Sequence, residues 1–465
     1  MKYTKVIALS LIAILLLACI AGCGTNKGGE SQADGKVTIT IGNWPDDTKP
    51  EELEIAEKRL KAFNEKYPDV IVKRDTSDYD VKTFIAKAGS GQLPTIYGTF
   101  FTEIDKIINA GYAADITSAM RQYGYDTDIN PDLLELCSRD GKIYALPVDC
   151  YAQGLFVNEE LFERAGLLDD NGGVIFPETY EELGRIAKII KDKTGVAGFV
   201  LPATNNCGGW HFMNIGWAYG VQFMAQEDGK WVSKLDSPEA VAALQYIKDL
   251  KWEYGVLPEN VFIDKEEMEK LFATGQAAMC ILDPPGANLT KQYKMDKDSI
   301  TVGRMPAGPV NRYSQMGGNV RMIAPNATPE QIEAVFNWLE FEGITPIISE
   351  QTIISWEDAY KLDFDTGNIV LDQNPFKVWI NPERVSAEND VRAKYLNIDP
   401  AKFESYYSFE DVIIRPEEPV ACQDLYSLLD SCIQEVLTNK DADPAEIIKK
   451  ASEDFQKNYL DKVEE

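Results

Sequence analysis

A strand, a helix and a second strand follow one another directly in residues 37–72. Residues 37–43 alternate Val and Ile with Thr, which is the two-residue period of a strand. Residues 51–67 space their apolar side chains at helical intervals, and Pro68 ends this helix. Residues 70–72 are again β-branched. Two strands joined by a helix predict a sheet with parallel strands and crossover helices.

The same alternation continues through most of the chain and predicts the α/β class. About 430 residues are too many for one ordinary core, so we expect two lobes. Further helices are predicted at residues 81–89, 102–111, 159–166, 179–193, 238–254, 265–275, 328–343 and 424–438, and strands at 95–97, 143–147, 277–282 and 320–324. Residues 355–419 are rich in Asp, Asn and Pro, and we interpret them as a loop-rich insertion or lid.

The N-terminus has the pattern of a secretory signal. Lys2 and Lys5 precede an apolar run at residues 6–17, and small residues follow at 20–23. The run is too short to span a bilayer comfortably. Residues 1–22 are therefore predicted to be a signal peptide, which places the body of the protein outside the cytoplasm.

The segment at residues 20–23 resembles the lipobox of bacterial lipoproteins, which implies cleavage before Cys23 and a lipid on its thiol. Cys19 is a weaker alternative, because the apolar core before it would be cut short. Residues 24–35 contain almost only polar residues and glycine, so residues 23–36 are predicted to form a lipidated flexible tether. Acyl chains would hold the protein on the outer face of the cell membrane.

The net charge excludes one class of partner. It is −29, and it becomes more negative when Lys2 and Lys5 leave with the signal. A surface with this much negative charge repels nucleic acid and anionic lipid. We therefore expect contact with the membrane through the lipid anchor only. Six cysteines remain after the leader without a metal or redox spacing, and their pairing is left open. Cys422 and Cys432 are predicted to share one helix, too far apart to bond.

The residues for most kinds of catalysis are absent. His211 is the only histidine, which argues against a Ser-His-Asp triad and excludes paired-histidine zinc sites. No nucleotide-binding glycine motif is present, and we expect no metal and no cofactor. Asp363, Asp365 and Asp372 around Gly367 resemble a calcium loop only faintly. A glycosidase needs just two carboxylates, so this class stays open.

Aromatic and polar residues follow several predicted strands. Trp44 follows the first strand, Phe100 and Phe101 follow the strand at 95–97, and Asp149 and Tyr151 follow the strand near residue 147. Ligands of open α/β sheets bind outside the carboxyl ends of the strands. A sugar offers an apolar face to an aromatic ring and hydroxyls to a carboxylate or amide. This pattern favours carbohydrate binding, although each ring could equally belong to the core.

Several stretches together resemble the extracellular solute-binding proteins of carbohydrate ABC importers, the group similar to maltose-binding protein. They keep the order in which that family has them, and cover most of residues 37–345. The stretches are residues 142–166, with Asn158 before a helix that ends at Gly166; residues 177–198; residues 271–279, LFATGQAAM; and residues 303–326, with Gly317 and Gly318.

The resemblance implies two α/β lobes joined by a hinge, as in type II periplasmic binding proteins, with solute held between them. By position, it places in the ligand site Asp46, Thr99, Phe101, Tyr151, Trp210, Asp283 and Asn319. This chain has Asp283-Pro284-Pro285-Gly286 where relatives often have a tryptophan. Trp356, or Trp379, is our hypothesis for the missing aromatic platform.

The resemblance also implies a division of the chain and a set of partners. We expect residues 37–148 and 303–354 to form one lobe, and residues 149–302 and 355–465 to form the other. The protein would act as a monomer without enzymatic activity, capturing a small solute by lobe closure and delivering it to the transmembrane subunits of an ABC permease. A surface-attached glycoside hydrolase, or a binding protein for a peptide, polyamine or other non-sugar solute, are the alternatives.

Overall fold

The computed structural model describes residues 35–371 and 376–463. Cys23 and Asp372 lie outside these residues, as do the predicted signal peptide and nearly all of the tether. Within them, no helix is both long enough and apolar enough to cross a lipid bilayer.

The predicted strand–helix–strand opening is confirmed and forms one edge of a five-stranded sheet of order β2-β1-β3-β14-β6. Its strands are β1 (Val37–Ile41), β2 (Val70–Arg74), β3 (Ile96–Phe100), β6 (Ala145–Pro147) and β14 (Asn319–Ile323). β1 runs parallel to β2 and β3, whereas β14 runs antiparallel to β3 and β6. The first residue of β14 therefore lies at the same sheet edge as the last residues of β3 and β6.

Two further sheets are smaller. In one, β8 (Gly154–Asn158) lies between β11 (Met279–Leu282) and β12 (Ile300–Gly303), both antiparallel to it. In the other, β13 (Arg312–Gly317) pairs parallel with β15 (Val412–Pro416) and antiparallel with β7 (Tyr151–Ala152). Two hairpins complete the strands: β4 (Ser138–Arg139) with β5 (Lys142–Ile143), and β9 (Met224–Glu227) with β10 (Lys230–Ser233).

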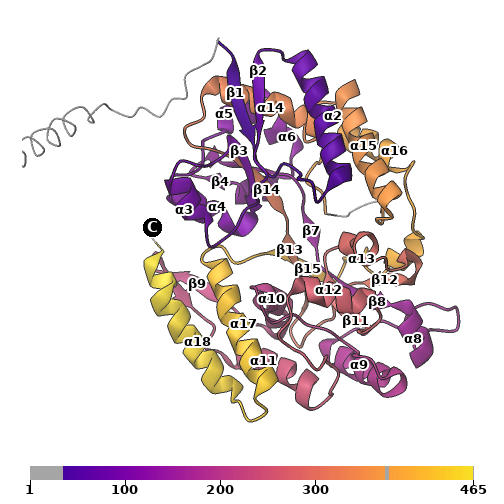
Figure 1. Ribbon diagram of the computed structural model, residues 1–465. Coiled ribbons are helices and arrows are strands. Elements are labelled where there is room, and N and C mark those ends of the chain that lie inside the picture. Colours follow the sequence, from indigo (N-terminus) through magenta and orange to yellow (C-terminus); the bar gives the residue numbers. More distant parts are fainter. Residues whose placement is uncertain (1–34, 372–375, 464–465) are drawn as a thin grey trace, which may run out of the picture.

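The helices fall into two groups (Figure 1). Beside the five-stranded sheet lie α2 (Pro50–Lys66), α3 (Phe84–Gly89), α4 (Ile104–Asn109), α5 (Thr117–Gln122), α6 (Tyr125–Asp128), α7 (Pro131–Leu136), α14 (Pro329–Glu342), α15 (Glu350–Thr366) and α16 (Pro382–Arg392). In the other part lie α8 (Glu159–Ala165), α9 (Tyr180–Thr194), α10 (Cys207–Tyr219), α11 (Pro238–Trp252), α12 (Lys265–Ala273), α13 (Ala287–Lys291), α17 (Cys422–Thr438) and α18 (Pro444–Asn458).

Local sequence signals set many helix ends. Thr328 caps α14 and forms a capping box with Gln331, and Thr179 caps α9 through the backbone N–H of Glu182. Gly166 ends α8 at a φ of 68°, a conformation that favours glycine. These caps explain why the predicted boundaries of the helices at 159–166, 179–193 and 328–343 agree with the structure.

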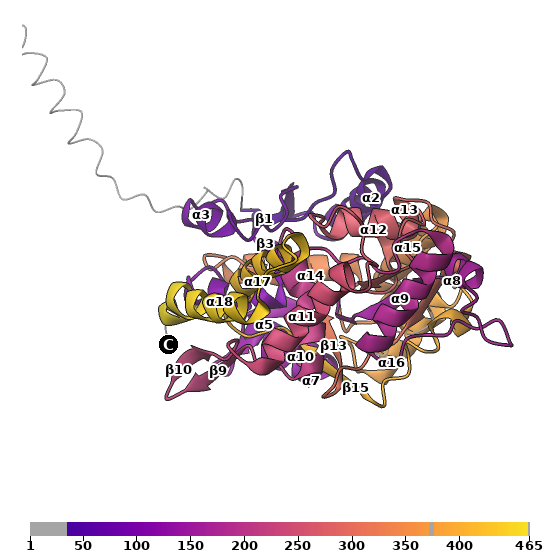
Figure 2. The ribbon, with the colours of Figure 1, turned by 90° about the horizontal axis from the view of Figure 1, so that it is seen from below.

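Each part has its own hydrophobic core. One core packs β1 and β3 against Phe63 and Trp338, and another gathers the buried faces of α9, α10, α11 and α17. Figure 2 shows α8 at one end of the molecule and the β9–β10 hairpin at the other, near the C-terminus. Cys422 and Cys432 both lie on α17 as predicted, and both are free thiols.

The interpretation of residues 355–419 as loop-rich is wrong for its first half. Residues 350–366 and 382–392 are the helices α15 and α16, which pack on each other, and α15 also contacts α14 and α2. Both helices have weakly patterned sequences, so a period alone does not reveal them. These contacts lie on the side of the five-stranded sheet. The predicted division of the chain at residue 355 stays a prediction.

Arg384 holds this segment in place although it is an arginine only 2% exposed. Its guanidinium lies 3.9 Å from the ring centroid of Trp379 and 4.9 Å from that of Trp356. Its Nε donates to the carbonyl of Thr345 at 2.8 Å, and its Nη1 pairs with Glu388 at 2.6 Å. The charge is therefore compensated in the interior.

Replacing Arg384 by Met should destabilise the protein by about 3 kcal/mol, because Glu388 and the Thr345 carbonyl would lose their buried partner. Urea unfolding followed by circular dichroism measures this loss. Lys394→Met is the control, because Lys394 is exposed and makes only a 3.4 Å ion pair with Glu357. Equal unfolding midpoints for the two variants would contradict the role given to Arg384.

Candidate ligand-binding cleft

A cavity of about 460 Å³ lies at the edge where β3 and β6 end and β14 begins, and we call it the central cleft. It is lined by Asn43, Asp78, Tyr79, Gly98, Thr99, Phe100, Val148, Asp149, Asn319, Val320 and Arg321. Most of these residues lie on, or just after, the strands β1, β3, β14 and β6, which are neighbours in one sheet. Three predicted site residues, Thr99, Asp149 and Asn319, line this cavity together.

Asp149 and Asn319 form a pair on the floor of the central cleft. The backbone N–H of Asn319 donates to Asp149 Oδ1 at 2.9 Å, and Asn319 Nδ2 donates to Oδ2 at 2.9 Å. Desolvation and the carboxylate of Asp283 raise the pKa of Asp149, whereas the bonds from Asn319 lower it. The pair fixes a carboxylate beside an amide, an arrangement that suits a hydroxylated solute.

The glycine pair between β13 and β14 brings Tyr151 beside Asp149. A Cβ on Gly317 would lie 2.6 Å from the ring of Tyr151, and a Cβ on Gly318 would lie 2.4 Å from the Asp149 carbonyl. No other residue type fits at either position without movement. The close approach packs the ring of Tyr151, the first residue of β7, against the end of β13.

Trp210 and Asp283 lie on the other side, next to Lys265. The Nζ of Lys265 contacts Asp283 Oδ1 at 2.7 Å and lies 5.3 Å from the ring centroid of Trp210. Trp210 is half-buried and Asp283 is partly exposed. Neither residue lines the central cleft, although the field of Asp283 reaches both Asp149 and Tyr151 and raises the pKa of each.

The remaining predicted site residues lie away from the central cleft. Phe101 is half-buried and packs under Gly318. Asp46 is exposed, accepts a hydrogen bond from the Thr48 backbone at 2.9 Å and lines none of the cavities described below. Trp356 is 5% exposed and lines another cavity, of about 340 Å³. Asp149 lines both this cavity and the central cleft.

Trp44 is only 5% exposed, so its ring is not open to a solute. The ring of Trp338 lies 5.6 Å away, and the guanidinium of Arg74 lies 5.5 Å from the Trp44 ring centroid. Only the edge of the indole remains for a contact. The roles predicted for Trp44, Asp46, Phe101 and Trp356 stay predictions.

Glu417 is a functional candidate that the sequence did not reveal. It follows β15 and accepts a hydrogen bond from the hydroxyl of Tyr426 at 2.7 Å. Desolvation raises its pKa to about 7, and the nearby carboxylate of Glu103 acts in the same direction. Gln315 on β13 also contacts Tyr426 and Trp210. One acidic residue among many gives no signal in a sequence, because its burial depends on the packing of β13, β15 and α17.

His211 is fully buried and its two ring nitrogens lie 2.7 Å and 3.0 Å from the carbonyls of Cys207 and Ile281. Desolvation lowers its pKa to about 4, so the imidazole is neutral at physiological pH. Its side chain is enclosed by the core, away from solvent. The described residues contain no group of three or more His, Cys, Asp and Glu arranged to hold a metal ion.

The model of the bacterial extracellular solute-binding protein family matches residues 47–343, more than half of the chain. The chain belongs to this family. A maltose-bound protein of T. maritima has the same fold, with a TM-score of 0.64 and 23% identity, over 90% of this chain and 99% of that one. The predicted family and the type II periplasmic-binding-protein fold are both confirmed.

Two relatives are more similar in sequence. A Brucella abortus (strain 2308) protein, described as a binding protein, is 26% identical over 362 residues, which are 73% of this chain and 80% of the relative. The melibiose/raffinose/stachyose-binding protein of Bacillus subtilis (strain 168) is 26% identical over 204 residues, 43% of this chain and 42% of the relative. Both are described as binding proteins rather than as enzymes.

The pKa of Glu417 predicts a dependence of stability on pH. Its value of about 7, against an ordinary 4.5, means that between these values the folded protein keeps a proton that the unfolded chain has released. The stability from this proton is complete below about pH 4.5 and is lost as the pH rises through 7. Relative to Glu417→Gln, the wild type should lose about 2 kcal/mol between roughly pH 5 and 7.5. Urea titrations across this range measure the difference, and parallel pH profiles would refute it.

Proposed function

We propose that this protein is the solute-binding component of an ABC importer, and that it captures a carbohydrate in the central cleft for delivery to a membrane permease. Membership of the extracellular solute-binding family supports binding outside the cytoplasm. The names of a relative and of a protein of known structure support a sugar, because they mention melibiose, raffinose, stachyose and maltose.

The Asp149–Asn319 pair at the aromatic wall of the central cleft is the observation that carries this proposal. The carboxylate and amide can exchange hydrogen bonds with neighbouring hydroxyls of a sugar. Thr99 also lines this cavity, although its side chain is 2% exposed. Tyr79 and Phe100 line the same cavity, and their rings suit the apolar face of a sugar. Rings beside fixed polar groups are the usual composition of a small-molecule site.

Capture would proceed by closure of two lobes around the solute. The solute favours the closed form only by the difference between its affinities for the closed and open forms. In the proposed division, residues 37–148 and 303–354 form one lobe and residues 149–302 and 355–465 the other. The proposed boundary at residue 355 most needs a test, because α15 packs on α14 and α2 of the first lobe and α16 packs on α15. The protein would act as a monomer and without catalysis.

Titration with a panel of maltose, melibiose, raffinose, stachyose and diacetylchitobiose tests the function. At least one sugar should change the tryptophan fluorescence of the purified chain, because closure of the lobes would alter the surroundings of the half-buried Trp210. Asn319→Leu should weaken that response at least tenfold by removing the amide that holds Asp149. Lys188→Ala is the control, because Lys188 is exposed and pairs only with Asp192 on its own helix.

Other results would point elsewhere. Release of reducing ends from a panel sugar would favour the glycoside hydrolase alternative. A response to spermidine and to no sugar would favour a cationic solute, which Asp78 and Asp149 could bind. No response to any of these compounds would refute carbohydrate capture.

The lipid anchor is a separate part of the proposal and has its own test. In Cys23→Ala, the increase in protein mass that an attached lipid causes should be absent. The exported protein should also move from the membrane fraction to the soluble fraction, because no other anchor is expected. Cys19→Ala is the matched control and should remain lipidated. Membrane association of both variants would exclude Cys23 as the anchor, and loss only in Cys19→Ala would move it to Cys19.

A further inference from the structure

The two parts of the molecule meet at the first turn of α17. Gln423 on this helix donates a hydrogen bond to the hydroxyl of Thr102 at 3.2 Å. Thr102 belongs to the short 3-10 helix η1 (Phe101–Glu103), which follows β3 of the five-stranded sheet. Glu103, the next residue, is 2% exposed. The contact therefore brings a buried carboxyl group of one part against a helix of the other.

Two carboxyl groups of the other part face Glu103, and we call Glu103, Glu417 and Asp424 the carboxylate junction. Burial raises the pKa of Glu417 and of Asp424, and the charge of Glu103 acts in the same direction on both. Lys106 of α4 pairs with Glu103 at 3.2 Å, and Lys106 and Lys462 both lower the pKa of Asp424. The charges that shift the pKa of Glu417 include Glu103 but neither of these lysines.

Glu417 is half-buried among side chains that are polar or aromatic rather than cationic. Tyr426 donates a hydrogen bond to it at 2.7 Å. Other side chains that face it are Cys422 from α17, Trp210 from α10, Gln315 from β13 and Tyr151 from β7. Arg415, which lies two residues before it, pairs with Glu418 at 3.0 Å. Burial and the charge of Glu103 therefore outweigh the hydrogen bonds and raise the pKa of Glu417 to about 7.

The surroundings of Glu417 depend on how the two parts sit together. Glu103 belongs to one part, whereas Glu417 and Tyr426 belong to the other. When the parts separate, Glu103 leaves and water reaches Glu417, so the pKa of Glu417 falls toward its ordinary value of 4.5. Between these two pH values the closed arrangement keeps a proton that an open one releases. This contribution to closure is complete below about pH 4.5 and is lost as the pH rises through 7.

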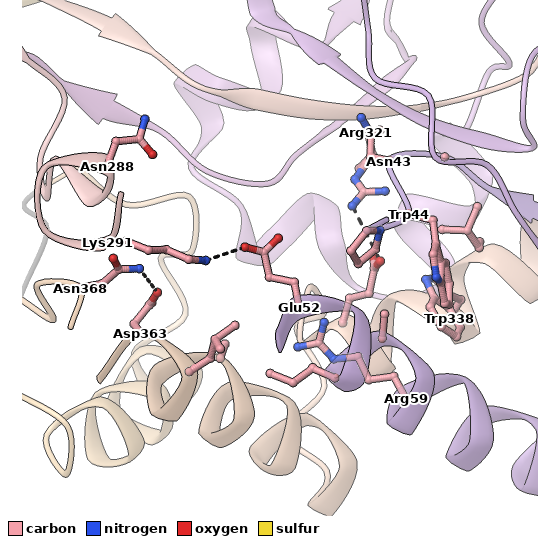
Figure 3. A pocket seen from close by; sticks show the side chains of 18 residues that line it. Asn43, Trp44, Glu52, Arg59, Asn288, Lys291, Arg321, Trp338, Asp363 and Asn368 are labelled. Carbon is pink, nitrogen blue, oxygen red and sulfur yellow. Dashed lines mark hydrogen bonds and ion pairs between the residues drawn. The ribbon is translucent and has the colours of Figure 1, made fainter. Parts of the chain in front are cut away.

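The parts also meet at α13 and α2, where the contact joins opposite charges (Figure 3). Lys291 of α13 pairs with Glu52 of α2 at 2.8 Å, and both side chains line a cavity of about 450 Å³. Their attraction favours the arrangement that repulsion at the carboxylate junction opposes. Because an exposed ion pair contributes little free energy, one proton at the junction is enough to shift this balance.

We propose that the carboxylate junction is a proton-operated switch, which favours closure of the two parts when Glu417 binds a proton and opening when Glu417 releases it. The proton comes from solvent and forms an O–H bond on the carboxylate, and no other bond changes. This inference goes beyond the proposed carbohydrate function but rests on it where closure is coupled to solute. Binding of solute then takes up protons near pH 7.

Isothermal titration of the full chain with the same five sugars at pH 6, 7 and 8 tests the switch. None of these sugars titrates in this range, so a change of affinity comes from the protein. The affinity of the wild type should be about threefold to tenfold higher at pH 6 than at pH 8, because a pKa that moves from 4.5 to about 7 on closure allows at most about tenfold. His211 does not contribute, because its pKa is about 4.

Two variants and a control identify the groups responsible. Glu417→Gln keeps the size of the side chain but cannot titrate, so its affinity should be the same at pH 6 and pH 8. Glu103→Gln removes the facing charge and should reduce the pH effect below that of the wild type. Glu181→Gln should keep the wild-type profile, because Glu181 is exposed and pairs with Arg185 on its own helix. Titrations in buffers of different ionisation enthalpy should show proton uptake in the wild type and none in Glu417→Gln.

The outcomes separate this inference from the proposed function. If a sugar binds the wild type equally at pH 6 and pH 8, or if Glu417→Gln keeps the pH dependence, the switch is refuted and the carbohydrate function stands. If no sugar binds at any pH, the proposed function fails, and small-angle X-ray scattering of the unliganded chain decides the switch. The wild type should then have a smaller radius of gyration at pH 6 than at pH 8, and equal values would refute the switch. Should Glu417→Gln not fold, Glu103→Gln decides the result.

Discussion

The close passage of the chain through Gly317 and Gly318 is the constraint on which the rest of the cleft depends. At these positions the ring of Tyr151 and the carbonyl of Asp149 occupy the space that a side chain would need. Because β13 ends and β14 begins here, the passage fixes the small sheet of β7, β13 and β15 against the end of the five-stranded sheet. Asn319 is then the first residue of β14, opposite Asp149. One steric condition thus sets both the junction of the two sheets and the position of the Asp149–Asn319 pair.

Buried polar groups in this protein differ in how completely they are paired. Arg384 is buried, and its guanidinium donates to the carbonyls of Thr345 and Gly343 and pairs with Glu388. It therefore stabilises α16 and has few free donors for a ligand. Thr99, Trp44 and Trp338 retain unpaired atoms. Leaving such atoms buried costs free energy in the unliganded protein, and a core of apolar residues would avoid that cost.

Much of the fold could be predicted from the sequence, because its elements carry local signals. The alternation of Val and Ile in β1 and the caps Thr179 and Thr328 depend on neighbours in the chain. The helices α15 and α16 lack such local signals and could not be predicted in this way. In the sequence Arg384 resembles a surface residue, whereas in the structure its guanidinium packs on the rings of Trp356 and Trp379. The sequence predicts an aromatic at the end of β1 but leaves open whether Trp44 is buried, since Trp338, which packs against it, comes from a distant helix. Asp149 and Asn319 could be predicted because they lie at strand ends. The surroundings of Glu417, Arg59 and Glu342 depend on packing between distant segments, which the sequence does not reveal.

Within residues 35–371 and 376–463, few polar contacts join the two parts of the molecule across the cleft. The ion pair of Lys291 with Glu52 involves side chains that are each about one third exposed, and the bond of Gln423 to Thr102 has a length of 3.2 Å. Exposed ion pairs contribute roughly 0–1 kcal/mol, too little to hold the closed arrangement against the entropy of opening. In the proposed function the solute would supply the free energy that favours the closed arrangement, by pairing with polar groups of the central cleft. Under that proposal the protein would stay responsive to its solute, because these polar contacts alone would not lock the closed arrangement.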